Sequence, residues 1–355
     1  MILRDLLRVL GSSDRREGRN LTHEEAYRAF LTILDGQESE VRIGAFLIAL
    51  RWKGLTVEEV TGFARAARER ATIPCQKVSG LVCVCPPHDG YDVVPPLEVA
   101  SGLVAAGAGA RVMLVCDRGV PPKRGLTAAH VLEHLKLPLA WDPGDCERTV
   151  AQSGFGAMAA PGMLPALLAL RRVRGDVGVR TPLSTIEKLI TPSSAAILLG
   201  SQHGAVLGLA AGTMAGLGHP SGIAIQGQGG GVIPSLSRRT RGVEIDGVHQ
   251  VPLSVEPSDF GLSTENPELP IYSPSDDGQG PGDNPALVKA AGEMSHAVLE
   301  GENGPARHAT LLGAALILKA ARRVPTLAEG LDAAQKSLDS GATRKVLAKL
   351  RAEKR

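Results

Sequence analysis

The sequence predicts an α/β protein with a small N-terminal helical domain and a large domain built on a mostly parallel central sheet. Helical periodicity and two capping boxes near the start predict the first domain. Short β-branched runs that alternate with helical stretches from about residue 78 predict the second. The chain has 355 residues, which suggests about two domains. We place the boundary at Pro74, so that residues 1–73 form the helical domain and residues 74–355 the α/β domain.

The helices of the first domain have recognisable starts and stops. Thr22 and Thr56 are each followed three residues later by a glutamate, Glu25 or Glu59. In such a capping box the hydroxyl accepts from a free backbone N–H, and the glutamate accepts from the N–H of the threonine. Between the two boxes, apolar residues recur at helical spacing and end at Gly54, which suits a helix C-cap.

The order of elements after residue 78 predicts the sheet. The expected strands are 81–85, 112–115, 197–199 and 223–225. The expected helices between them lie near 97–107, 127–136 and 204–217. Residues 255–285 are rich in proline, glycine, serine and aspartate, so we expect a long surface loop there. Residues 284–349 are predicted to be helical, with breaks at Gly301, Pro305 and Pro325.

Composition limits the classes of function. The formal net charge is only +2 and aromatic residues make up 3%, so a polycation or a protein that stacks bases on aromatic rings is not expected. The start does not resemble a signal peptide, and no apolar stretch is long enough for a membrane span, so we expect a cytoplasmic protein. The five cysteines suit a reducing compartment. Cys83 and Cys85 are expected in the core, because no second pair matches them as metal ligands.

The turn after the first expected strand raises the question of phosphate binding. A strand, a turn and a helix form the place where α/β enzymes often hold a phosphate on backbone N–H groups. Here the turn reads Pro86-Pro87-His88-Asp89-Gly90. Proline has no N–H to donate and a fixed φ, so the usual cradle cannot form. His88 remains a candidate phosphate contact, and the alternative is an ordinary exposed turn.

Four segments resemble the anthranilate phosphoribosyltransferase family. They are residues 21–60, 155–181, 298–318 and 326–350. The resemblance implies the fold shared by nucleoside phosphorylases and class II phosphoribosyltransferases, also called glycosyltransferase family 3. It also implies a homodimer formed through the helical domains. Helices within about 163–190 would join the small domain in space.

The resemblance implies transfer of a phosphoribosyl group from phosphoribosyl pyrophosphate to anthranilate with magnesium, but the motifs for that chemistry are altered. Residues 86–90 stand where the family has a Gly-Thr-Gly-Gly-Asp-Gly turn. Residues 116–127 lack the family's lysine, asparagine and serines. Residues 225–234 lack its adjacent Asp-Glu pair, which would supply oxygen ligands for magnesium. Glu244 and Asp246 follow, but their alternation is typical of an ordinary strand end.

Residues 117–133 and 178–192 resemble a divergent branch of that family more than the enzymes, and this branch lacks these motifs and binds nucleic acid along a basic groove of the dimer. Our leading hypothesis is therefore a non-catalytic, dimeric nucleic-acid-binding protein that needs no metal or cofactor. Phosphates would be bound by Arg171, Arg172, Arg174, Arg180, Lys123, Arg124, Arg118 and His88. The run Ser237–Arg241 would extend that surface. Arg174 and Arg180 keep the register of family arginines, and a guanidinium fork can bind two oxygens at once.

Other functions stay open. In a transferase with another acceptor, Arg174 and Arg180 would hold the acceptor, while His88 and Lys123 would hold the donor. That alternative requires magnesium and phosphoribosyl pyrophosphate. A pyrimidine nucleoside phosphorylase is less favoured because its Lys/Ser phosphate motif is not visible. A small-anion sensor is a third possibility, and no catalytic residue is assigned.

Overall fold

The computed structural model describes residues 2–11, 18–273 and 279–352. Its centre is a seven-stranded sheet in the order β3-β2-β1-β4-β5-β6-β7. The strands are β1 Leu81–Cys85, β2 Arg111–Cys116, β3 Phe155–Ala159, β4 Ala196–Gly200, β5 Ser221–Ile225, β6 Thr240–Asp246 and β7 His249–Val255. The first five pair in parallel, whereas β6 and β7 are antiparallel. The predicted mostly parallel sheet is confirmed.

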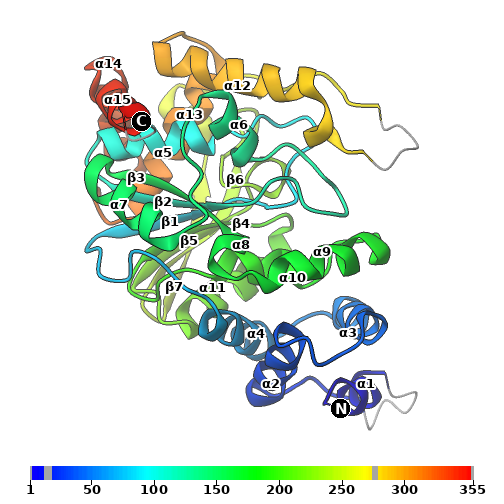
Figure 1. The fold of residues 1–355 in the computed structure, drawn as a ribbon. Helices are drawn as coiled ribbons and strands as arrows, with labels where there is room; N and C mark the ends of the chain where they lie inside the picture. Colours follow the sequence, from blue (N-terminus) through cyan, green and yellow to red (C-terminus); the bar gives the residue numbers. More distant parts are fainter. Residues whose placement is uncertain (1, 12–17, 274–278, 353–355) are drawn as a thin grey trace.

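Helices cover both faces of this sheet, and a helical domain lies below it (Figure 1). The helical domain contains α1 Ile2–Leu10, α2 His23–Leu34, α3 Glu40–Lys53 and α4 Val57–Arg70. The middle helices are α5 Glu98–Gly107, α6 Ala128–His134, α7 Pro143–Ser153, α8 Ala160–Met163, α9 Ala166–Val177, α10 Leu183–Ile186 and α11 Leu207–Gly216. The last are α12 Pro285–Glu300, α13 Pro305–Ala320, α14 Leu327–Asp339 and α15 Ala342–Ala352. None of the described helices is long and apolar enough to cross a membrane.

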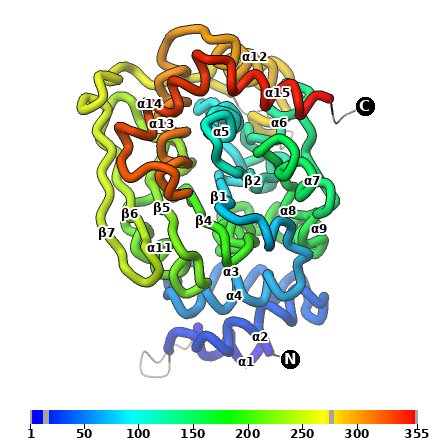
Figure 2. Tube along the Cα trace, turned by 90° about the vertical axis from the view of Figure 1, so that its left-hand side faces the viewer, coloured from blue at the N-terminus to red at the C-terminus, as the bar shows by residue number. Residues whose placement is uncertain are grey.

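Alternation along the strands separates two hydrophobic cores. Val82 and Val84 point into a core that is shared with α5, α6 and α12 to α15. Cys83 and Cys85 point to the other face, where α7 to α11 and the helical domain pack. Figure 2 shows the two helical layers with the sheet between them. All five cysteines are buried and free, so the core assignment of Cys83 and Cys85 is confirmed.

Local signals at the start of the chain form as predicted. The amide of Glu25 donates to Thr22 Oγ1 at 3.2 Å, and the amide of Thr22 donates to Glu25 Oε2 at 2.9 Å. The second box, at Thr56 and Glu59, is also closed. Gly54 caps α3 with a φ of 85°. Glu59 is fully buried and accepts from Lys53 Nζ at 2.9 Å, which ties the end of α3 to α4.

The sequence analysis missed β3 and β7 and indicated only the end of β6, at Glu244 and Asp246. The segment of β3, Phe155–Ala159, has no β-branched residue and becomes a strand because it pairs with β2. β6 and β7 form a hairpin on the edge of the sheet, joined at Gly247, which has a φ of 57°. The expected surface loop over 255–285 is mostly loop, with short 3₁₀ turns at Pro257–Phe260 and Pro281–Asp283. Residues 274–278 of that loop lie outside the described residues.

The packing of α2 on α4 leaves no room for a side chain at Gly62. A Cβ there would lie 2.5 Å from the carbonyl oxygen of His23 and 3.0 Å from the amide nitrogen of Tyr27. Backbone atoms cannot yield as a side chain can, so we expect Gly62→Ala to destabilise the protein by about 1–3 kcal/mol. Urea unfolding followed by circular dichroism measures this free energy.

The matched control is Gly208→Ala in α11, where a Cβ would meet nothing within 4 Å. Alanine favours a helix by roughly 0.5–1 kcal/mol over glycine, so this variant should be equally or more stable than the wild type. Equal stability of the two variants would contradict the close helix contact at Gly62.

Candidate functional site

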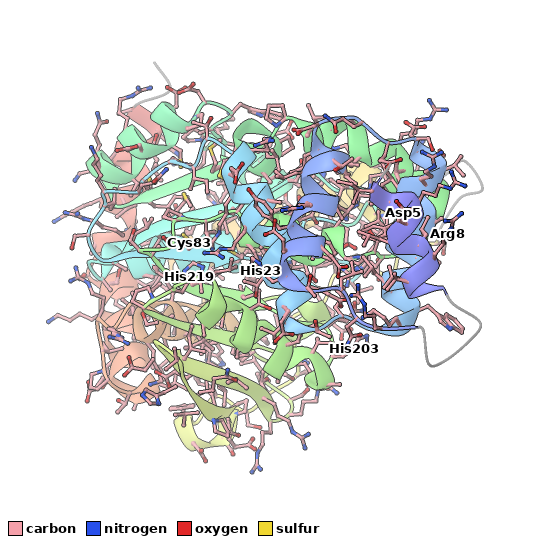
Figure 3. The ribbon with its side chains drawn as sticks, turned by 90° about the horizontal axis from the view of Figure 1, so that it is seen from below. Asp5, Arg8, His23, Cys83, His203 and His219 are labelled. Carbon is pink, nitrogen blue, oxygen red and sulfur yellow. The ribbon has the colours of Figure 1, made fainter. Side chains whose placement is uncertain are left out.

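A cleft with a volume of about 830 Å³ lies between the helical domain and the carboxyl ends of the parallel strands. We call it the interdomain cleft. Strand order reverses between β1 and β4, and open α/β sheets bind ligands at such a switch point. The lining comes from the end of α3, the turn after β1, the loop after β2, residues 178–189 and the loop after β4. His203 of that last loop lies beside the helical domain in Figure 3.

The turn after β1 is held by the loop after β2. The amide of Tyr91 donates to the carbonyl of Leu126 at 2.8 Å, and the amide of Gly125 donates to the carbonyl of Asp89 at 2.8 Å. Gly90 has a φ of 78°, and a Cβ there would lie 2.5 Å from the backbone of Gly125. Because the amides of Gly90 and Tyr91 already have carbonyl partners, they are not free to bind a phosphate.

Asp89 and Arg180 form the central ion pair of the cleft. Arg180 Nη2 donates to Asp89 Oδ1 at 2.6 Å, and Arg180 Nε donates to Asp89 Oδ2. The remaining Nη1 donates to the side chain of Gln202, and Arg51 of α3 donates to the carbonyl of Arg180. The Asp89 side chain is 1% exposed. This clamp therefore joins the turn after β1, the segment after α9, the loop after β4 and the helical domain.

Glu98 and Tyr91 fill the space at the start of α5. Glu98 is the first residue of that helix, it is 1% exposed, and neither of its carboxyl oxygens has a hydrogen-bond partner among the described residues. Burial raises the pKa of Glu98 to about 8, and the nearby Tyr91 hydroxyl offsets only part of that rise. A helix N-terminus after the first strand often holds a phosphate. In this protein the first residue of that helix is itself a buried carboxylic acid, and it does not line the interdomain cleft.

The glycine-rich segment after β5 makes room for Tyr91. A Cβ at Gly231 would lie 2.2 Å from the Tyr91 hydroxyl oxygen, and one at Gly229 would lie 2.8 Å from its ring. A Cβ at Gly230 would lie 3.1 Å from Gln202. The triple glycine is therefore required by close packing.

Lys188 is a buried cation on the wall of the cleft. Its Nζ donates to the carbonyl of Gly200 at 2.6 Å, at the end of β4. Among the described residues, none has a carboxylate oxygen within 4.0 Å of that nitrogen. Burial lowers the pKa of Lys188 to about 8, and the positive charge of the nearby Arg180 contributes to this lowering. The cleft thus contains a positive charge without a paired anion.

Two predicted phosphate ligands are buried, contrary to the predicted surface contact. Arg174 is 4% exposed and donates to the carbonyl of Pro121, to Glu187 and to Ser184. His88 is 1% exposed, and its Nε2 lies 3.2 Å from the carbonyl oxygen of Val115. Burial lowers the pKa of His88 to about 4, which keeps the ring neutral at neutral pH. Both side chains serve the packing of the loops and do not face a ligand.

The other predicted ligands divide between two cavities. Lys123 and Arg180 line the interdomain cleft. Arg118, Arg124, Arg171 and Arg172 line a second cavity of about 480 Å³, which we call the flank cavity. Most carry an acidic partner: Arg118 with Glu133 at 3.0 Å, Lys123 with Asp92 at 3.1 Å, Arg171 with Asp117 at 2.6 Å and Arg172 with Glu40 at 3.5 Å. In the part of the chain that the structure describes, Arg124 has no such partner.

The residues present do not fit the magnesium site that the resemblance implies. The described residues contain no group of three or more histidines, cysteines, aspartates or glutamates placed to hold a metal. Glu244 pairs with Lys319 at 3.0 Å, and Asp246 pairs with Arg322. Asp246 lies opposite Ser221, at the amino end of β5, whereas the cleft lies at the carboxyl ends.

Sequence analysis missed Tyr91, Glu98 and Lys188. A signal existed for two of them: Glu98 follows Pro95-Pro96-Leu97 at a helix start, and Lys188 lies beside Glu187 with apolar residues on either side of that pair. Tyr91 carried no signal, because only the fold brings it against the glycines after β5.

Comparisons with known proteins agree with this architecture. A model of a glycosyl transferase family helical bundle domain matches residues 14–71, and one of a glycosyl transferase family a/b domain matches residues 96–344. The anthranilate phosphoribosyltransferase of Symbiobacterium thermophilum is 32% identical over 338 residues, which is 94% of each chain. That of Bacillus mycoides is 31% identical over 336 residues, 94% of this chain and 93% of its own. The crystal structure of the Thermus thermophilus enzyme superposes with a TM-score of 0.80 at 26% identity, covering 99% of this chain and 98% of that one.

The unpaired charge of Lys188 predicts a pH-dependent stability. Its folded pKa of about 8 lies below the ordinary 10.5, so the folded state disfavours the proton, and the penalty is complete below pH 8. We expect Lys188→Met to stabilise the protein at pH 7 by about 1–3 kcal/mol, with the gain shrinking as the pH rises from 8 to 10.5. Urea unfolding at pH 7 and pH 10 measures the difference.

Lys345→Met is the matched control, because Lys345 is exposed on α15. It should change stability by less than about 0.5 kcal/mol at either pH. A loss of stability in Lys188→Met that is independent of pH would contradict an uncompensated charge.

Proposed function

We propose, from the premise that this chain belongs to the glycosyl transferase family of the anthranilate phosphoribosyltransferases, that it binds nucleic acid through the phosphate backbone. Within the family we place it in the divergent branch that lacks the catalytic motifs. The observation that carries the proposal is the internal occupation of the site after β1. Arg180 holds Asp89, and Glu98 lies buried at the start of α5. A pyrophosphate would meet the clamped carboxylate of Asp89 there, while the amides of Gly90 and Tyr91 already donate to carbonyl oxygens of the chain.

The remaining cations support an anionic ligand. Lys188 in the interdomain cleft and Arg124 at the flank cavity have no carboxylate within 4.0 Å among the described residues. Phosphates of a nucleic-acid strand would supply the missing negative charge. Because aromatic residues make up only 3% of the chain, contact through phosphates is favoured over base stacking.

Fluorescence anisotropy with a labelled single-stranded oligonucleotide tests this function. We expect binding that weakens steeply with salt, with a log–log slope of about −0.7 for each phosphate contact. Phosphoribosyl pyrophosphate with magnesium should not displace the strand. Lys188→Met should weaken binding and reduce the steepness of the slope, whereas Lys345→Met should change neither. Absence of binding even at low salt would refute the proposal.

Phosphoribosyl transfer is the second candidate, because 32% identity over 94% of the chain links it to a relative named as anthranilate phosphoribosyltransferase. Calorimetry with phosphoribosyl pyrophosphate and magnesium would detect donor binding. A loss of anthranilate fluorescence in the presence of phosphoribosyl pyrophosphate and magnesium would detect turnover. Turnover above that of a Lys188→Met control would favour this candidate over nucleic-acid binding.

We also propose that the chain is a homodimer through its helical domains. An exposed apolar stripe on α3 supports this: Val41, Ile48 and Trp52 recur at helical spacing, and Trp52 is 93% exposed. Leu168 on the adjoining α9 is also exposed. A stripe of this kind favours burial against a second copy of the same surface.

Sedimentation velocity tests the dimer. Trp52→Glu places a charge in the middle of the stripe and should give a monomer at concentrations where the wild type is a dimer. Trp141→Glu is the matched control, since Trp141 is 52% exposed but lies in the α/β domain. A wild type that sediments as a monomer would rule out this arrangement.

A further inference from the structure

A third cavity, of about 400 Å³, lies on the far side of the glycine segment from the interdomain cleft. Its wall is formed by the segment after β5 and by the turn that leads into β6. The lining residues that matter here are Gln226, Gln228, Arg238, Arg239 and Arg241. Val94 and the acidic Glu268 also contribute to the wall. We call residues 235–241 the arginine turn.

The arginine turn is held by a partly buried hydrogen-bond network. The amide of Ser235 donates to Thr240 Oγ1 at 2.9 Å, which closes the turn on itself. Asn266 accepts from the amide of Leu236 at 2.7 Å and donates to Ser237 Oγ at 3.1 Å. Ser235 and Thr240 are both buried. The backbone that presents the arginines is therefore fixed before any ligand arrives.

Two of the three arginines keep their charge free. Arg239 pairs with Glu256 at 3.1 Å. Arg238 and Arg241 are exposed, and within the described residues neither has a carboxylate oxygen within 4.0 Å. This differs from the arginines predicted as ligands near α9, most of which are neutralised by neighbouring acids. The arginine turn is thus a stronger source of unpaired positive charge than the run from Arg171 to Arg180.

The three cavities lie in series along the carboxyl edge of the sheet. The loop after β2 separates two of them, since Pro121 and Arg124 line the flank cavity while Pro122 and Lys123 line the interdomain cleft. The glycine segment separates the next two, since Gly230 lines the cleft and Gly229 the third cavity.

Two glutamines bridge that second boundary. Gln226 Nε2 donates to the carbonyl of Gln202 at 3.4 Å, and Gln202 accepts from Arg180. Gln226 belongs to the lining of the third cavity and Gln202 to that of the cleft. A neutral, hydrogen-bonding surface therefore continues from the clamp to the third cavity, where Glu268 is the one acidic residue among the described residues of the lining.

We infer that the arginine turn binds phosphates at one end of a path that runs through all three cavities, so that the ligand is a single-stranded polyanion rather than one phosphoryl group. This inference rests on the proposed nucleic-acid function and adds its path. The unpaired cations are distributed, with Arg124 at one end, Lys188 in the middle, and Arg238 and Arg241 at the other. One phosphate cannot contact cations in separate cavities, whereas a strand with a charge on every nucleotide can.

The test compares the double variant Arg238→Gln/Arg241→Gln with the wild type on a long and a short oligothymidylate, about 30 and 5 nucleotides long. Anisotropy is measured over a range of salt. On the long strand we expect roughly ten-fold weaker binding at low salt and a log–log slope that is less negative by about 1.4, or 0.7 for each lost contact. The short strand, which can occupy the cleft alone, should bind both proteins alike.

The matched control is Arg344→Gln/Lys345→Gln, which removes the same charge from the exposed face of α15. It should bind the long strand as the wild type does. Equal affinity and slope for the arginine-turn variant and the wild type would overturn the path while leaving the proposed function intact. An equal loss of affinity in both double variants would mean that only the net charge matters, and this result would also overturn the path. No binding by the wild type at any salt would instead refute the proposed function.

Discussion

The clamp between Asp89 and Arg180 is the interaction on which the rest of the cleft depends. It closes the turn after β1 with two parallel hydrogen bonds. Further hydrogen bonds join Arg180 to Gln202 in the loop after β4 and to Arg51 in the helical domain. A bidentate pair between a guanidinium and a carboxylate fixes both groups in one plane. Because Asp89 is 1% exposed, loss of Arg180 would leave a buried charge without a partner. The two groups are therefore better understood as one structural unit than as a ligand site and its neighbour.

The requirement that a buried charge has a partner of opposite sign also explains the residues around the clamp. Carboxylates beside the cleft are matched by cations, as Glu187 is by Arg174 and Asp117 by Arg171. Among the described residues Glu98 pairs with no cation, and its raised pKa means that it is mostly the neutral acid near neutral pH. Lys188 is the opposite case, because none of the described residues has a carboxylate oxygen within 4.0 Å of its Nζ. The charge of Lys188 is therefore the one that an anionic ligand would neutralise.

The fold was predictable because its signals are local. The boxes at Thr22 and Thr56, the β-branched runs of β1 and β2, and the breaks before α13 and α14 each depend on a few adjacent residues. The site was less predictable because its pairs are distant in sequence. Arg180 finds Asp89 across 91 residues, and no sequence pattern separates an arginine bound to an acid from one that faces solvent. Basic runs in the sequence therefore overstated the unpaired charge near α9 and understated that of the arginine turn, where Arg238 and Arg241 have no acidic partner among the described residues.

The position of Lys188 makes the cleft a proton-coupled site. Its pKa of about 8 means that an appreciable part of the molecules carries a neutral amine in slightly alkaline solution. An anion that binds next to Nζ would raise the pKa of Lys188 towards 10.5, and the neutral amine would then take up a proton from the buffer. The measured heat of association at pH 8 would accordingly vary with the ionisation enthalpy of the buffer. Ligand binding and proton uptake would thereby be coupled through one side chain.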